Sequence, residues 1–164
     1  MFYLLYGFIF LIAAFQLQYY LPQLPDPVAP HFDFAGTPNG WMSKKHFAYF
    51  YGILLPLLTG IFALLGLIIR KMPDKLINIP HKAYWLAPER REKSMRSLQN
   101  MNNCTGVVVG FFVVLIMQAV IVANLERYPQ LGFDRVMSLL GVLVAFALFN
   151  ILYIRRRFRA PGER

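Results

Sequence analysis

Four long apolar stretches, separated by polar or proline-rich segments, dominate the pattern along the chain. They cover about residues 2–20, 47–69, 105–124 and 136–154, and none contains Asp, Glu, Lys, Arg or His. A helix needs roughly 20 apolar residues to cross a hydrocarbon core of about 30 Å. Continuous apolar runs favour helices over barrel strands, whose residues alternate. We therefore expect an all-α integral membrane protein with four transmembrane helices in one membrane domain, residues 1–164.

Composition supports this class. Hydrophobic residues make up 57% of the chain and charged residues 15%, where a soluble domain has roughly 25% charged residues. Cys104 is the only cysteine, which excludes a disulfide framework. We expect Cys104 to be a free, buried thiol at the end of the third span, with palmitoylation as the alternative.

Basic residues are distributed unevenly among the connections. Segment 70–104 contains eight Lys and Arg residues and the basic tail 155–164 contains five, whereas loops 21–46 and 125–135 contain four together. The positive-inside rule predicts that both termini and a cytoplasmic loop 70–104 lie in the cytoplasm, with loop 21–46 outside the inner membrane. We expect the basic cytoplasmic face to attract anionic lipids. Since topology explains the charge and no nucleic-acid-binding pattern occurs, we expect no nucleic acid partner.

The outer loop, residues 21–46, has features of an ordered segment. Prolines at 22, 25, 27, 30 and 38 favour extended, stiff backbone. Residues 37–40 read as a turn, Trp41 can anchor the loop at the membrane interface, and Ser43 can cap the second span. We expect this stiff, aromatic loop to bind a peptide or protein partner. The candidate residues are His31, Phe32, Asp33, Gly36, Pro38, Gly40 and Trp41.

The same loop resembles a known family. Leu24-Pro25, the run from Val28 to Phe32, Gly36-Thr37-Pro38, Gly40-Trp41 and Ser43-Lys44 are similar to domain of unknown function 1648. That domain forms the N-terminal part of SdpI-type immunity proteins, and the run from Tyr84 to Arg91 resembles a segment of longer members. The resemblance implies a membrane protein of immunity or signalling type.

Other chemistry has weaker support. His31 and Asp33, with Asp26 or His46, could supply N and O ligands to a metal, and a protonatable His31 could sense pH. No paired metal-ligand spacing supports the first idea, so we expect no metal and no cofactor. The spans hold no catalytic carboxylate pair, Ser/His pair or zinc motif. We expect a protein that is not an enzyme.

The segment before the third span combines basic and apolar residues. Pro88 suits the first turn of a helix that runs to about residue 103. We expect this amphipathic helix to lie on the membrane surface, although a surface that docks a partner would have the same pattern. Its face toward lipid headgroups or a partner would consist of Tyr84, Trp85, Arg90, Arg91, Lys93 and Arg96.

Small residues and polar residues inside the spans predict helix packing. Gly106 with Gly110, and Gly141 with Ala145, have the spacing that lets two helices approach closely. Gln118 is the best candidate for a hydrogen bond between helices, and Pro56 should kink the second span. These features leave three alternatives open: a homo-oligomer, an accessory subunit of a larger membrane complex, and a lipid or small-molecule carrier that uses the kink.

Overall fold

The computed structural model describes residues 2–160 and 162. Four of its helices are long and apolar enough to cross a membrane, which confirms the all-helical, four-span prediction. These are α1 (Phe2–Tyr20), α2 (Lys44–Ile68), α4 (Pro88–Leu125) and α5 (Phe133–Arg157). The short helices η1 (Ile69–Lys71), η2 (Asp74–Leu76) and α3 (Lys82–Trp85) connect α2 to α4. Among the described residues, β-pairing is limited to isolated bridges within loop 21–43.

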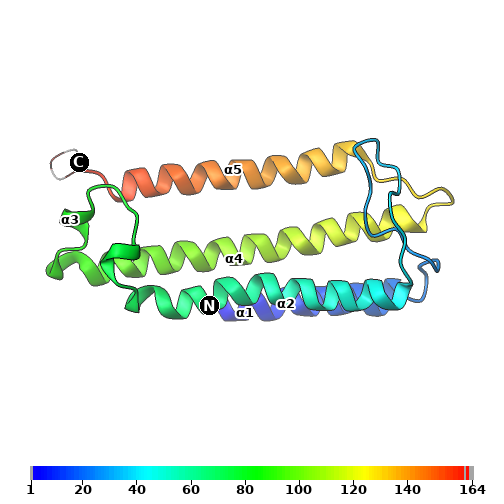
Figure 1. Cartoon of the computed structure of the whole chain (residues 1–164), viewed down its shortest axis with the longest axis horizontal. Coiled ribbons are helices and arrows are strands. Elements are labelled where there is room, and N and C mark those ends of the chain that lie inside the picture. The colour runs from blue at the N-terminus through cyan, green and yellow to red at the C-terminus, as the bar shows by residue number, and fades with distance from the viewer. Residues whose placement is uncertain (1, 161, 163–164) are drawn as a thin grey trace.

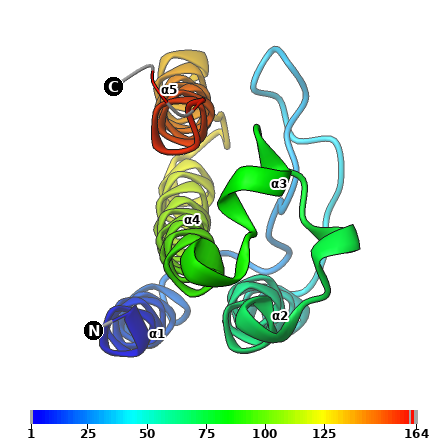
Figure 2. The same ribbon diagram turned by 90° about the vertical axis from the view of Figure 1, so that its left-hand side faces the viewer.

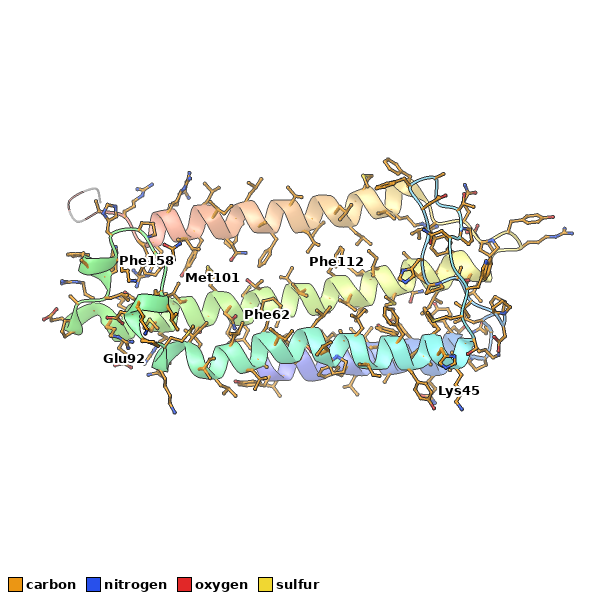
Figure 3. All side chains as sticks on the ribbon, viewed as in Figure 1. Lys45, Phe62, Glu92, Met101, Phe112 and Phe158 are labelled. Carbon is orange, nitrogen blue, oxygen red and sulfur yellow. The ribbon has the colours of Figure 1, made fainter. Side chains whose placement is uncertain are left out.

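The central helix is α4, with α1 and α2 against one side and α5 on the other (Figures 1 and 2). Residues 21–43 and 126–132 lie together at one end of the bundle, which we call the loop end. Residues 69–87 and 158–160 lie at the opposite end, which we call the basic end. Figure 3 shows Lys45 at the loop end and Glu92 and Phe158 at the basic end.

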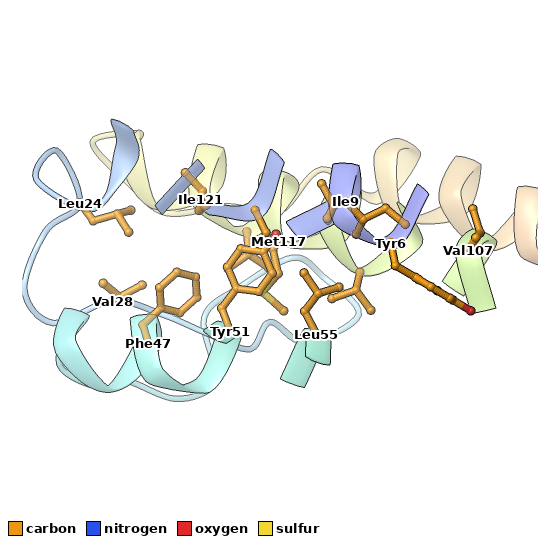
Figure 4. Packing of buried hydrophobic residues seen from close by; sticks show 14 residues of the cluster. Tyr6, Ile9, Leu24, Val28, Phe47, Tyr51, Leu55, Val107, Met117 and Ile121 are labelled. Atoms are coloured by element: carbon orange, nitrogen blue, oxygen red, sulfur yellow. The ribbon is translucent and has the colours of Figure 1, made fainter. Parts of the chain in front are cut away.

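The main core fills the space between α1, α2 and α4. Ile9, Phe47, Tyr51 and Ile121 are almost completely buried there (Figure 4). The first loop contributes to the same cluster, since Val28 has no exposed surface. Packing of three helices with one loop therefore forms a single structural unit.

Two glycines on α4 allow this close packing. A Cβ on Gly106 would collide with the Tyr6 hydroxyl and would lie 2.5 Å from the Phe62 Cβ. A Cβ on Gly110 would lie 3.0 Å from both Ile9 and Thr59. The prediction that Gly106 and Gly110 serve helix packing is confirmed, and the packing is within one chain.

A polar network crosses the same interface. Gln16 Nε2 donates to Gln118 Oε1 at 2.8 Å, and the Tyr51 hydroxyl donates to Gln16 Oε1 at 2.6 Å. These bonds satisfy polar groups that the bilayer interior cannot hydrate. They link α1, α2 and α4 and confirm the interhelical bond predicted for Gln118.

The prediction of a separate helix on the membrane surface is wrong. Residues 88–103 form the first part of α4, which runs without interruption for 38 residues, or about 57 Å. No Pro or Gly occurs between Pro88 and Thr105 to end a helix, and the buried residues Ser94, Met95 and Asn103 continue the stripe that contains Gly106. The expected burial of Cys104 is also wrong, because this residue is exposed on the surface of α4.

Helix α5 packs differently from the other spans. None of its residues is buried, whereas 56% of the apolar window of α4 is buried. Nothing lies within 4 Å of a Cβ placed on Gly141, and Ala145 is also exposed. These two residues therefore pack no helix within the described part of the chain, and their contact with a second molecule stays a prediction.

The basic end has its own small core. Phe158, just after α5, is completely buried with Trp85, Met95 and Ile79. The Trp85 indole N–H donates to the Arg159 carbonyl at 3.0 Å, and the Arg157 guanidinium lies 4.9 Å from the Trp85 ring. The placement of Trp85 on a lipid-facing surface is therefore wrong, because the segment after η2 folds back over the end of α5.

Candidate binding groove at the loop end

The first loop is attached to α4 by one buried side chain. Asn124 Oδ1 accepts from the Ala29 N–H, and Asn124 Nδ2 donates to the Ala29 carbonyl, both at 2.8 Å. Prolines in the loop cannot donate backbone hydrogen bonds, so this amide fixes the backbone where few other partners exist. Asn124 therefore joins the middle of the first loop to α4.

Asp33 organises the tip of the loop. Its Oδ1 accepts from the backbone N–H groups of Ala35 and Thr37, both at 2.9 Å. Gly36 takes φ +78° inside this turn, a conformation that favours glycine. The carboxylate therefore shapes the backbone and holds a tight turn.

The turn brings the first loop against the connection between α4 and α5, residues 126–132. The Leu131 N–H donates to the Gly36 carbonyl at 2.9 Å, and a Cβ on Gly36 would collide with the Leu131 carbonyl. Residues almost a hundred positions apart are thus joined directly, and the start of α5 is held next to the first loop.

A groove of about 350 Å³ opens between these segments. Its rim is strongly apolar: Phe34 is 96% exposed and Phe133 is 59% exposed. The lining residues are Phe32, Asp33, Phe34, Gly36, Asn39, Leu131, Phe133, Val136, Met137 and Leu140. The one charged group among them, Asp33, is engaged in the turn, so the groove suits an apolar ligand.

The structure separates the predicted site residues into two groups. Phe32, Asp33 and Gly36 line the groove. The others lie elsewhere on the loop: the His31 ring contacts Phe50 edge-on, Pro38 pairs with Phe32 in a β-bridge, and Trp41 is 55% exposed. Gly40, the remaining predicted residue, does not line the groove either.

Sequence reasoning missed the residues that complete the groove. Phe34 could have been found, because an aromatic residue between Asp33 and Gly36 stands at the tip of a tight turn. Leu131, Phe133 and Met137 had no comparable signal, since only the folded chain brings them to the first loop.

The four possible metal ligands of this region have other contacts. Asp26 Oδ1 accepts from the Lys44 N–H at 3.3 Å, and Asp33 holds the turn. Ser43 Oγ accepts from the His46 backbone N–H, which confirms Ser43 as the N-cap of α2, and the same oxygen lies 2.8 Å from His46 Nδ1. Within residues 2–160, no three His, Cys, Asp or Glu side chains gather as a metal site would require.

The predicted headgroup face at the basic end is partly used inside the protein. The Arg90 guanidinium stacks 4.0 Å from the Tyr84 ring, and Arg91 Nε pairs with Asp74 at 2.9 Å. Lys93 and Arg96 remain exposed. Arg96 pairs with Glu92 at 3.0 Å. Most of this face is therefore engaged in contacts within the protein, and it is not a flat lipid-binding surface.

Comparison with known proteins finds a family match for one part of the chain. Residues 8–60 match the family model of a domain of unknown function (DUF1648), which confirms the family predicted from the loop pattern. The match covers most of α1, the first loop and the first part of α2. No curated protein and no solved structure matches the chain.

Proposed function

We propose that this multi-pass membrane protein binds a peptide or protein partner, without catalysis, through the region that matches DUF1648, residues 8–60. The partner inserts an apolar side chain or short apolar segment into the groove between the first loop and α5. The function is of the immunity or signalling type that the SdpI-like pattern suggests. The observation that carries the proposal is the ordered apolar groove rimmed by Phe34 and Phe133.

The rigidity of the loop supports binding. Asn124, the Asp33 turn and the bridge between Val28 and Met42 hold the backbone through contacts within the protein. A preorganised site avoids the entropy cost of ordering a loop on binding. Exposed aromatic side chains on such a frame supply most of the energy in many protein interfaces.

We propose that the loop end faces the outside of the cytoplasmic membrane. The acidic and basic residues of the connections at this end balance: Asp26 and Asp33 offset Lys44 and Lys45, and Glu126 and Asp134 offset Arg127 and Arg135. The net positive charge belongs to the other end, which the positive-inside rule assigns to the cytoplasm. A neutral apolar groove outside the cell suits a secreted or membrane-bound polypeptide.

Photo-crosslinking in native membranes tests the proposal. A photoreactive phenylalanine analogue replaces Phe34 on the loop wall or Met137 on the α5 wall. We expect both positions to crosslink the same polypeptide, because they line one groove. Tyr128 is the matched control, since it is 76% exposed at the same end but does not line the groove. Adducts shared by Phe34 and Tyr128, or different adducts from the two walls, would contradict the proposal.

Binding of the purified crosslinked partner then separates the groove from the rest of the loop. Phe34→Ala removes a large apolar contact worth about 1.5–3 kcal/mol when buried, so we expect affinity to fall at least tenfold. Trp41→Ala removes an exposed aromatic residue from the same loop outside the groove and should leave affinity nearly unchanged. Equal losses in both variants would assign recognition to the loop surface instead.

A second candidate function is that of an accessory subunit in a larger membrane complex. The observation that favours it is α5, whose apolar surface and open Gly141 contact little within this chain. Native-size analysis in mild detergent tests it: a lone monomer would speak against it, and a defined assembly would support it.

A further inference from the structure

A second cavity lies at the basic end, away from the loop groove. Its volume is about 590 Å³, within the range of small-ligand pockets. It lies between the end of α2 and the first part of α4. The lining residues are Leu67, Arg70, Lys71, Pro88, Arg91, Glu92, Met95 and Gln99.

The end of α2 and the start of α4 form this pocket. Helix α4 extends from Pro88 along η1 and the last turns of α2. The residues Pro88, Glu92, Met95 and Gln99 are spaced four, three and four apart, so they share one helix face. That face forms one wall, and α2 with η1 forms the other.

Arg91 makes the wall rigid. Its Nε donates to Asp74 Oδ1 at 2.9 Å, and its Nη2 donates to the Met72 carbonyl at 2.7 Å. Gln99 Nε2 donates to the Gly66 carbonyl at 2.6 Å on the opposite side of the cavity. Hydrogen bonds within the protein therefore frame the pocket on both sides.

The charge of the pocket is positive. Arg70, Lys71 and Arg91 line it with a single carboxylate, Glu92. Glu92 Oε1 accepts from both Arg70 and Arg96 at 3.0 Å, so its charge is already neutralised. Within residues 2–160, Lys71 forms no ion pair, and Arg70 keeps guanidinium N–H groups beyond the one that binds Glu92.

An apolar track leads from the membrane interior to the pocket. Leu57, Ile61, Leu64 and Leu67 are exposed on α2 at spacings of four, three and three residues. Arg70 and Lys71 follow as the first charged residues after the apolar part of this helix. An amphiphile could thus lie with its chain along α2 and its head in the pocket.

We propose that this pocket binds the phosphate group of an anionic phospholipid. Arg70 and Lys71 contact the phosphate, the polar headgroup fills the space beside Gln99, and one acyl chain lies along the exposed stripe of α2. Basic pockets between transmembrane helices suit this ligand chemistry because cations and an apolar path coincide at the membrane boundary. The site is separate from the partner groove, which lies at the opposite end of the bundle.

Native mass spectrometry of the detergent-purified full chain tests this proposal. Phosphatidylglycerol and phosphatidylcholine are titrated separately, and we expect phosphatidylglycerol to bind at least tenfold more tightly. Since each basic residue near a lipid phosphate contributes about fivefold, Lys71→Gln should weaken phosphatidylglycerol binding roughly fivefold, and Arg70→Gln with Lys71→Gln roughly 25-fold. Lys71→Arg keeps the charge and should bind like the wild type.

A matched double variant separates the pocket from general surface charge. Lys75→Gln with Arg155→Gln removes the same charge from the same end, at exposed residues that do not line the pocket. Unchanged binding in this control supports the site, whereas equal weakening by both pairs would overturn it. Displacement of the lipid by millimolar inorganic phosphate would also overturn it, because a soluble anion would then be the occupant. An unchanged melting temperature of Lys71→Gln shows that the fold is intact.

Discussion

At the scale of single residues, a few buried polar groups and glycines fix the geometry. Asn124 is 2% exposed and satisfies both backbone groups of Ala29, in addition to donating to the Val120 carbonyl at 2.9 Å. A buried backbone group without a partner costs about 1–3 kcal/mol. The position of the first loop therefore depends strongly on one amide.

Removing that amide should loosen the loop. We expect Asn124→Ala to lower the free energy of unfolding by about 3 kcal/mol, since it leaves the Ala29 N–H and carbonyl unpaired. Thermal unfolding in detergent measures the effect, and limited proteolysis of residues 21–43 locates it. Asn150→Ala is the control, because the Asn150 side chain donates to the Phe146 carbonyl of its own helix. Similar losses in the two variants would contradict the role given to Asn124.

Two glycines allow the cost of an added methyl group to be compared at a packed and at an open position. Gly106→Ala places a methyl group against Tyr6 and Phe62, whereas Gly141→Ala places it in open space. Overpacking costs about 1–3 kcal/mol, so we expect Gly106→Ala to lower the melting temperature and Gly141→Ala to leave it unchanged or slightly raised. A destabilised Gly141→Ala would instead reveal a contact of α5 with another molecule.

At the scale of elements, α5 is joined to the bundle mainly at its two ends. The hydrogen bond from Leu131 to Gly36 holds the loop end, and the buried Phe158 side chain holds the basic end. Between them no α5 residue is buried. Local opening starts where buried contacts are few, so α5 is the span that separates most easily from the others.

Truncation of Phe158 should release the basic end of α5. Removal of a buried phenylalanine side chain costs about 3–5 kcal/mol. We expect Phe158→Ala to speed hydrogen exchange in residues 150–160 while α1, α2 and α4 keep their protection. Phe149→Ala, which removes a 60% exposed ring from the same helix, should change exchange little. Uniformly faster exchange across all four spans would show that α5 is an integral part of the core.

At the scale of the whole molecule, charge is the most polarised property. The basic end carries the cations of segment 69–96 and of residues 155–159, whereas acidic and basic residues balance at the loop end. Transfer of so many cations across a membrane is unfavourable. The proposed orientation, with the basic end in the cytoplasm, follows from this asymmetry.

Cysteine labelling of intact cells checks the orientation. In a Cys104→Ala background, Asn39→Cys at the loop end and Lys75→Cys at the basic end each provide one exposed thiol. We expect a membrane-impermeant maleimide to label Asn39→Cys in intact cells and Lys75→Cys only after permeabilisation. The opposite pattern would reverse the topology and place the groove in the cytoplasm.

Local features were predictable from the sequence because they depend on neighbouring residues. The lengths of the apolar runs predicted the four spans. Helix α1 matches its predicted range, and α5 is longer than predicted by three residues at each end. The N-cap Ser43 and the close approach at Gly106 also follow from local pattern. The separate surface helix was wrong because a change in composition at Cys104 does not end a helix when no breaker is present.

The sequence alone determined the class of protein, its number of spans and its charge asymmetry, because hydrophobic length and charge act on each segment independently of the others. Only the tertiary structure decided which surfaces exist. The groove requires Gly36 beside Leu131, the buried Trp85 requires α5 to end next to α3, and the basic pocket requires η1 beside the first part of α4. These contacts join residues far apart in the chain, so the pattern of one segment does not indicate which other segment it will meet.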